Sequence, residues 1–138
     1  VGGKPNGDPW KIGVQNPYDA RGEYVGIMSM KDEAIVSSGT YERYFEENGK
    51  IYHHILDPKT GYPSDNSLNS VSIVTSKSID GDGLSTSTFL LGLEKGMELI
   101  ERLDGVEAVF ITKDKNVYVS SGLKDKFIIT NSEFKEVQ

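Results

Sequence analysis

The chain has 138 residues, 36% of them apolar and 26% charged, which is the size and balance of one domain with a real hydrophobic core. Its formal net charge of -6 at pH 7 would repel phosphate backbones, so we expect no nucleic-acid partner. The absence of cysteine excludes disulfides, thiolate metal sites and a cysteine nucleophile. No stretch approaches the roughly 20 apolar residues of a membrane span, so we expect residues 1–138 to form a single soluble domain.

The first half of the chain is rich in β-favouring runs separated by turn residues. These runs predict strands over 10–15, 24–29, 33–38, 40–45 and 50–56. The short connection at 30–32 predicts a hairpin of its two flanking strands, and Asn48-Gly49 predicts a tight turn between the last two. The chain opens without Met on Val1-Gly2-Gly3, a turn typical of a junction between strands, so we expect a part of a longer protein.

The second half combines a loop, helices and further strands. Proline and glycine predict a loop over 57–66, and alternation predicts a strand over 68–75 with Val71 and Ile73 on one face. A helix capped by Ser76 or Ser78 should run to 91, and a second should span 93–103. Strands are expected over 106–112, 116–120 and 127–130, before a polar tail. This order predicts an α+β fold with two consecutive helices on one face of a largely antiparallel sheet.

Two histidines, His53 and His54, end the strand that runs into the Pro-Gly loop. Neighbouring residues on a strand face opposite ways, so we expect at most one of them to serve a site. The simpler alternative is that both are ordinary strand-end residues. In the loop itself, Asp57-Pro58-Lys59-Thr60-Gly61 has the composition of a common Asx-type turn.

Asp82 and Thr86 lie four residues apart in the first predicted helix, so a carboxylate and a hydroxyl can point together at a hard cation that keeps some waters and phosphate oxygens. The alternative is that Asp82 only complements the helix dipole while Ser85 and Thr86 only pack. A third candidate, Ser37-Ser38-Gly39, could place a hydroxyl at a strand end, although Ser-Gly is also a frequent turn pair.

These segments resemble, in order, the motifs of the ApbE family of FAD:protein FMN transferases. The family string of Ser-Gly, a Tyr-rich hairpin and His-Ile-Ile-Asp-Pro-x-Thr-Gly is similar to Ser38-Gly39 and to residues 54–61. The family signature Asp-Ala-Leu-Ser-Thr-Ala, followed by Phe and Leu-Gly, resembles residues 82–92, and residues 9–17 look like its Pro-Trp-x-x-Gly-Ile strand. Gly83 and Ser87 stand where alanine is usual, and nothing matches the family's larger N-terminal portion.

The resemblance implies roles for particular residues. Asp82 and Thr86 correspond to Mg ligands, with Ser85 assisting from the same turn, and His54 corresponds to the catalytic histidine, a general base for an acceptor hydroxyl. The expected flavin-binding residues are His54, Leu56, Asp57 and Thr60. The implied fold is ApbE-like and T-fold-like, and the chain would be the C-terminal portion of that domain.

The implied activity is Mg-dependent transfer of the FMN half of FAD to a Ser or Thr hydroxyl of an acceptor protein, with release of AMP. The expected acceptor is an exported redox protein. The expected location of the parent protein is the extracytoplasmic face of the cell membrane, reached through an N-terminal lipid anchor outside this sequence. Two alternatives stay open: hydrolysis of FAD to FMN and AMP, and a flavin-binding module that is inert by itself.

Overall fold

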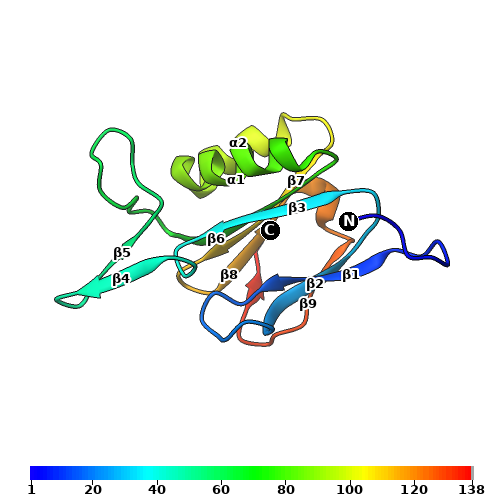
Figure 1. Cartoon of the computed structure of the whole chain (residues 1–138), viewed down its shortest axis with the longest axis horizontal. Coiled ribbons are helices and arrows are strands. Elements are labelled where there is room, and N and C mark those ends of the chain that lie inside the picture. Colours follow the sequence, from blue (N-terminus) through cyan, green and yellow to red (C-terminus); the bar gives the residue numbers. More distant parts are fainter. Residues whose placement is uncertain (138) are drawn as a thin grey trace.

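The computed structural model describes residues 1–137, which form three layers (Figure 1). Helices α1 (Ser78–Leu91) and α2 (Leu93–Glu101) cover one face of a five-stranded sheet. Its strands, in the order β10-β8-β7-β6-β3, are Lys135–Glu136, Asn116–Val119, Val106–Thr112, Leu68–Thr75 and Ala34–Gly39. A three-stranded sheet lies on the other side, in the order β1-β2-β9, with strands Trp10–Gln15, Tyr24–Met30 and Phe127–Ile129.

The core is divided by the five-stranded sheet into two apolar clusters. Ile73 and Phe110 pack with Phe89 of α1 on the helix side. On the opposite side, Val74 and Val109 pack with residues of the three-stranded sheet. β6, which lies between β7 and β3, is buried along its whole length because both faces of the sheet are covered. Val71 and Ile73 belong to the helix-side cluster, as the alternation predicted, and Val74 belongs to the other. The predicted α+β class is confirmed.

The predicted hairpin of 24–29 with 33–38 is wrong. β2 pairs with β1 and β9, whereas β3 pairs with β6, so the two segments belong to different sheets. The connection between them carries the chain from one layer to the other through Asp32, whose φ of 56° is left-handed. Alternation identifies a strand with a buried face, but it does not identify the strand that pairs with it.

Several element ends also differ from the prediction. The N-cap of α1 is Lys77, and no side chain caps this helix, because neither predicted serine occupies the capping position. α2 ends at Glu101 rather than at 103. The tail contributes the short strand β10, which pairs in parallel with β8. Neither helix within residues 1–137 has the length and apolar character needed to span a membrane.

A separate hairpin of β4 (Tyr44–Glu47) and β5 (Lys50–His53) projects from one end of the layers (Figure 1). Its turn residues Asn48 and Gly49 have φ values of 52° and 74°, as a primed two-residue turn requires. The predicted hairpin is thus confirmed, although β4 begins later than expected. β5 ends at His53 rather than at 56, so the loop begins earlier than predicted.

Two helical glycines test how closely the helices pack. A Cβ at Gly96 would lie 2.8 Å from Thr88 Cγ2 and 3.0 Å from the Thr88 carbonyl oxygen, whereas a Cβ at Gly83 would meet nothing within 4 Å. We expect Gly96→Ala to lower the free energy of unfolding by about 1–3 kcal/mol through overpacking. Gly83→Ala should raise it by about 0.5–1 kcal/mol through helix propensity. Urea denaturation of the chain measures both, and equal stabilisation by the two changes would contradict the close contact at Gly96.

Candidate functional site

A chain of hydroxyl groups joins the end of β3 to the first turns of α1. Ser38 Oγ donates to Ser85 Oγ at 2.9 Å, and Ser85 Oγ donates to the Asp82 carbonyl oxygen at 3.1 Å. Thr86 Oγ1 lies 3.2 Å from Ser38 Oγ. Because the one Ser38 hydroxyl proton goes to Ser85, Thr86 is the donor in its bond to Ser38. The lone pairs of the Thr86 hydroxyl are therefore left for another partner.

This cluster depends on a close approach of α1 to β3. A Cβ at Gly81 would lie only 3.0 Å from Val36 Cγ2, so glycine at this position lets the helix rest on the strand. The approach unites Ser38-Gly39 with the Asp82–Thr86 segment, two candidates that are separate in the sequence. Because Ser-Gly is so common a turn pair, the local sequence does not identify Ser38 as a site residue. Only the folded arrangement reveals its partners.

Asp82 and Thr86 are both exposed on α1, with oxygen donors of the hard type that Mg prefers. Within residues 1–137, no three His, Cys, Asp or Glu side chains gather in a way that could hold an ion. One carboxylate and one hydroxyl fit only part of the octahedral shell of Mg, which usually keeps waters and binds substrate phosphate oxygens. The donor set thus fits a shared metal site rather than a complete protein cage.

The two imidazoles face different surroundings, as the strand alternation predicted. The exposed His54 ring has Nδ1 3.1 Å from the Arg43 carbonyl oxygen. A carbonyl only accepts, so in the neutral ring Nδ1 carries the proton and Nε2 keeps a free lone pair. His54 therefore presents the nitrogen that a general base needs.

His53 is buried, with 8% of its surface exposed. Its Nε2 lies 3.1 Å from the Ser64 carbonyl oxygen, so this ring is the opposite neutral tautomer. Its Nδ1 is buried and has no hydrogen-bond partner among the described residues. Burial is the main cause that lowers the pKa of His53 below the usual histidine value.

The loop after His54 is built by its own turn contacts. The Asp57 carboxylate accepts from the Lys59 amide at 2.8 Å, and the Asp57 carbonyl accepts from the Gly61 amide at the same distance. Thr60 Oγ1 accepts from the Tyr62 amide at 3.3 Å. The Asx-type turn is therefore present, and the side chains of Asp57 and Thr60 shape the loop. Their predicted role toward flavin stays a prediction, as does that of Leu56, which is 48% exposed.

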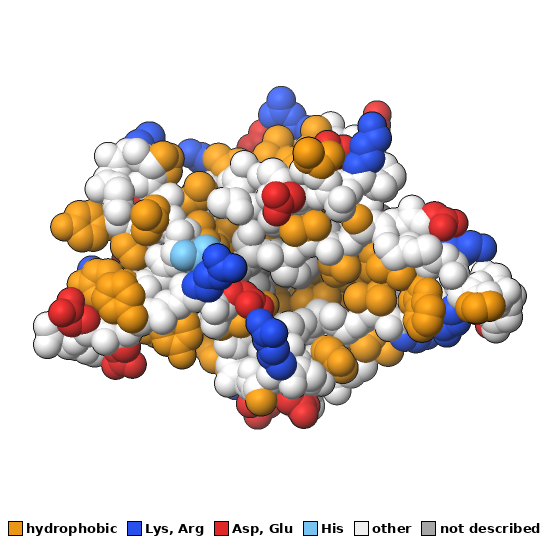
Figure 2. All heavy atoms as spheres, viewed as in Figure 1, with side chains coloured by type: hydrophobic (Ala, Val, Ile, Leu, Met, Phe, Trp, Pro, Cys, Tyr) orange, Lys and Arg blue, Asp and Glu red, His pale blue; other side chains and the backbone are white. Residues whose placement is uncertain are grey.

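An aromatic cavity of about 570 Å³ lies between the β4–β5 hairpin and this loop. It is lined by Arg43, Tyr44, Phe45, Tyr52, His53, His54, Leu56, Gly61, Tyr62 and Pro63. Figure 2 shows hydrophobic side chains gathered over this end of the molecule. An apolar, aromatic lining with a few polar groups is typical of sites for planar ligands. The density of tyrosine in the hairpin was visible in the sequence, whereas the part played by the Arg43 carbonyl was not.

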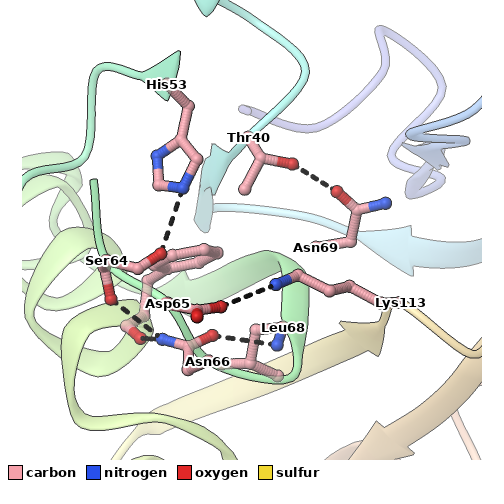
Figure 3. Close-up of polar contacts among 9 residues, drawn as sticks. Thr40, His53, Ser64, Asp65, Asn66, Leu68, Asn69 and Lys113 are labelled. Carbon is pink, nitrogen blue, oxygen red and sulfur yellow. Dashed lines mark hydrogen bonds and ion pairs between the residues drawn. The ribbon is translucent and has the colours of Figure 1, made fainter. Parts of the chain in front are cut away.

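Asn66 is a structural residue that the sequence analysis missed. Its Nδ2 donates to the Phe89 carbonyl oxygen at 2.8 Å and to Ser64 Oγ at 3.2 Å, and its Oδ1 accepts from the Leu68 amide at 2.9 Å (Figure 3). The side chain thereby fastens the end of the loop to α1 and to the start of β6. The local sequence does not predict a bond from Asn66 to a carbonyl near the distant end of α1.

Comparison with known proteins places these features in a family context. The model of the ApbE family matches residues 1–110. The chain is 39% identical over 128 residues to an FAD:protein FMN transferase of Klebsiella pneumoniae, covering 93% of this chain and 40% of that protein. It is 40% identical over 125 residues to the enzyme of the same description from Treponema pallidum, covering 91% and 34%.

Solved structures give the same result. The ApbE protein of Thermotoga maritima superposes with a TM-score of 0.80 at 31% identity, over 91% of this chain and 40% of that one. The flavin transferase ApbE of Vibrio cholerae superposes with a TM-score of 0.70 at 29% identity, again over 91% and 40%. The present chain thus spans about two fifths of the length of these relatives.

Proposed function

This chain belongs to the ApbE family, and on that premise we propose that it is the C-terminal part of a Mg-dependent enzyme that transfers FMN from FAD to a protein. The acceptor group is a Ser or Thr hydroxyl, and AMP is released. The observation that carries the proposal is the pairing of two features: an oxygen-donor cluster on α1, and a free His54 Nε2 beside an aromatic cavity.

The aromatic cavity lies near the C-terminal end of α1, because His53 of its lining packs against Phe89. Phe89, whose ring packs against His53, lies seven residues after Asp82, about 10 Å along the helix axis at a rise of about 1.5 Å per residue. A dinucleotide is long enough to place its ring system in the aromatic cavity and its pyrophosphate between His54 and the Asp82 end of α1. A single phosphate or a free flavin would use only one of the two.

In the proposed reaction, Asp82 and Thr86 would hold Mg together with substrate oxygens. The ion, when bound, would neutralise the charge that develops on the pyrophosphate. His54 Nε2 accepts the proton of the acceptor hydroxyl, while the hydroxyl oxygen bonds to the FMN-side phosphorus. The bond from that phosphorus to the AMP oxygen breaks, and AMP leaves with the electron pair. The products are a phosphoester between FMN and the acceptor, and AMP.

Partner and location follow from the same proposal. The acceptor would be an exported redox protein with a short Ser- or Thr-containing segment, and the enzyme would act on the extracytoplasmic face of the cell membrane, held by an N-terminal lipid.

One observation favours hydrolysis as a second candidate: His54 is exposed, so its Nε2 could activate water instead of a protein hydroxyl.

The test uses the full gene product that contains this sequence, incubated with FAD and Mg, with and without a Ser/Thr acceptor peptide. We expect fluorescent flavin on the peptide and one AMP for each flavin transferred, and removal of Mg by EDTA should lower the rate by at least about 100-fold. FMN and AMP formed equally well without peptide would establish the hydrolase instead. FAD binding without either product would indicate a flavin-binding module.

A further inference from the structure

His53 is a buried titratable residue that the proposed reaction does not use. Its ring packs edge-on against Phe89, with centroids 6.2 Å apart and an interplanar angle of 79°. Nε2 bonds the Ser64 carbonyl oxygen at 3.1 Å, whereas Nδ1 is buried without a partner in residues 1–137. An unpartnered polar atom in such a position calls for a physical explanation.

The partner of His53 lies at the base of the loop that follows His54. The Ser64 amide donates to the Ile55 carbonyl oxygen at 2.9 Å, and Leu56 and Pro63 form a bridge just beyond it. Ser64 Oγ accepts from Asn66, which also bonds α1 (Figure 3). The bond from His53 to Ser64 thus connects β5 to the base of the loop, next to the bridge between Leu56 and Pro63.

The ring also forms part of a wall between two cavities. His53, Tyr62 and Pro63 line both the aromatic cavity of about 570 Å³ and a second cavity of about 590 Å³ on the other side of the hairpin. Movement of the ring, or of the loop base that it holds, would change the shape of both. The residue is therefore placed to set the form of the aromatic cavity without presenting a reactive atom to it.

Protonation would be costly in this arrangement. The neutral ring donates from Nε2 and leaves Nδ1 buried without a partner, but the charged ring would bury a second N–H with no acceptor. The bond to the Ser64 carbonyl favours the charged ring, but the cost of burying the charge is larger, so the pKa of His53 is lowered. Of the charged and titratable groups around the ring, Lys113 and His54 oppose a positive charge, and only Asp65 favours one. Asp65 is itself paired with Lys113 at 3.5 Å, so its carboxylate stabilises a charged His53 ring less.

We infer that His53 is a positioning residue: in its neutral form it holds the 54–64 loop through the Ser64 carbonyl, and protonation at the buried Nδ1 drives the ring out of its buried position, which releases the loop and weakens FAD binding. The inference rests on the proposed function for the identity of the ligand. The hydrogen bond between His53 and the Ser64 carbonyl is present in this chain whatever the ligand is. FAD binding should therefore weaken in acid because the loop moves, and this effect is separate from the proton transfer at His54.

The sign follows from linkage. The free or open state of His53 titrates near the usual value of about 6.5, and the lowered pKa of the buried ring means that the pinned state, in which the ring holds the loop, binds fewer protons. Well above pH 6.5 both states are neutral, and proton binding does not disfavour the pinned state. As the pH falls below about 6.5, the open state gains protons first, so the pinned state is disfavoured progressively until the pH passes the lowered pKa.

The experiment has two arms. In the chain itself, ¹⁵N NMR of the His53 ring should show the Nε2–H tautomer and titration below that of a free histidine. The amide protection factors of Ser64 and Asp57, which correct for the intrinsic slowing of exchange in acid, should fall as the pH falls. In the full gene product, the Kd for FAD should rise by about tenfold between about pH 7.5 and pH 5. His53→Gln, whose amide can donate to Ser64 but does not titrate, should flatten most of that rise.

Each outcome decides something. A His53→Gln variant with the wild-type pH slope would overturn the inference, and so would an Nδ1–H tautomer or an ordinary titration of the ring in NMR. His53→Phe, which keeps the bulk but not the donor, should bind FAD weakly at every pH; if it fails to fold, the Gln variant and the NMR arm still decide. If the gene product binds no FAD at all, the proposed function fails, while tautomer, titration and amide exchange test the hold of His53 on the loop by themselves.

Discussion

Asp82→Asn should lower the rate of FMN transfer by at least about 10²-fold, because the substitution removes the one carboxylate that the α1 cluster offers to a cation. The change keeps the shape of the side chain and leaves the Ser38, Ser85 and Thr86 hydroxyl bonds in place, since Ser85 bonds the backbone carbonyl of residue 82. The apparent affinity for Mg should fall together with the rate. Initial rates measured over a range of Mg concentrations separate the two effects.

The matched control is Asp80→Asn, which removes the same charge from an exposed residue in the first turn of the same helix. Asp80→Asn forfeits an interaction with the helix dipole worth about 0.3–1 kcal/mol, and Asp82→Asn forfeits no more than that because Asp82 lies beyond the first turn. Equal losses of transfer in the two variants would therefore assign the effect to helix stability. A fully active Asp82→Asn enzyme with unchanged Mg dependence would remove this residue from the metal site.

Strands β6 and β7 of the five-stranded sheet could be predicted because their local sequence reflects their burial. β7 carries an apolar run, whereas β6 alternates apolar with small polar residues, and the ends of both strands agree with the expected ranges. The pairing of β2 and β3 could not be predicted in the same way. Both have a buried face, but the choice of partner depends on which layer each strand reaches after the turn at Asp32.

The candidate site, too, could be predicted only in part from the sequence. Alternation predicted that His53 and His54 diverge, but it could not say which ring is buried, because that depends on Phe89 from a helix far along the chain. The spacing of Asp82 and Thr86 predicted one helix face. The contribution of Ser38 depends instead on the contact of α1 with β3, a long-range arrangement that no local motif encodes.

His54→Ala should lower kcat for FMN transfer by about 10²- to 10⁴-fold, the usual contribution of a general base, while the Kd for FAD changes much less. The reason is geometric: the Arg43 carbonyl fixes the proton on Nδ1, so the ring offers Nε2 to an acceptor hydroxyl. Parallel measurements of FAD binding and of flavin appearing on the acceptor peptide distinguish the two parameters.

The exposure of the His54 ring allows a sharper test of the same role. Because the ring is open to solvent, the space that His54→Ala vacates is accessible to small molecules, and added imidazole should restore part of the transfer rate in that variant and not in Asp82→Asn. Rescue would show that the lost function is a proton acceptor at this point. A variant that loses FAD affinity, keeps kcat and does not respond to imidazole would make His54 a binding residue, and another group would then have to act as the base.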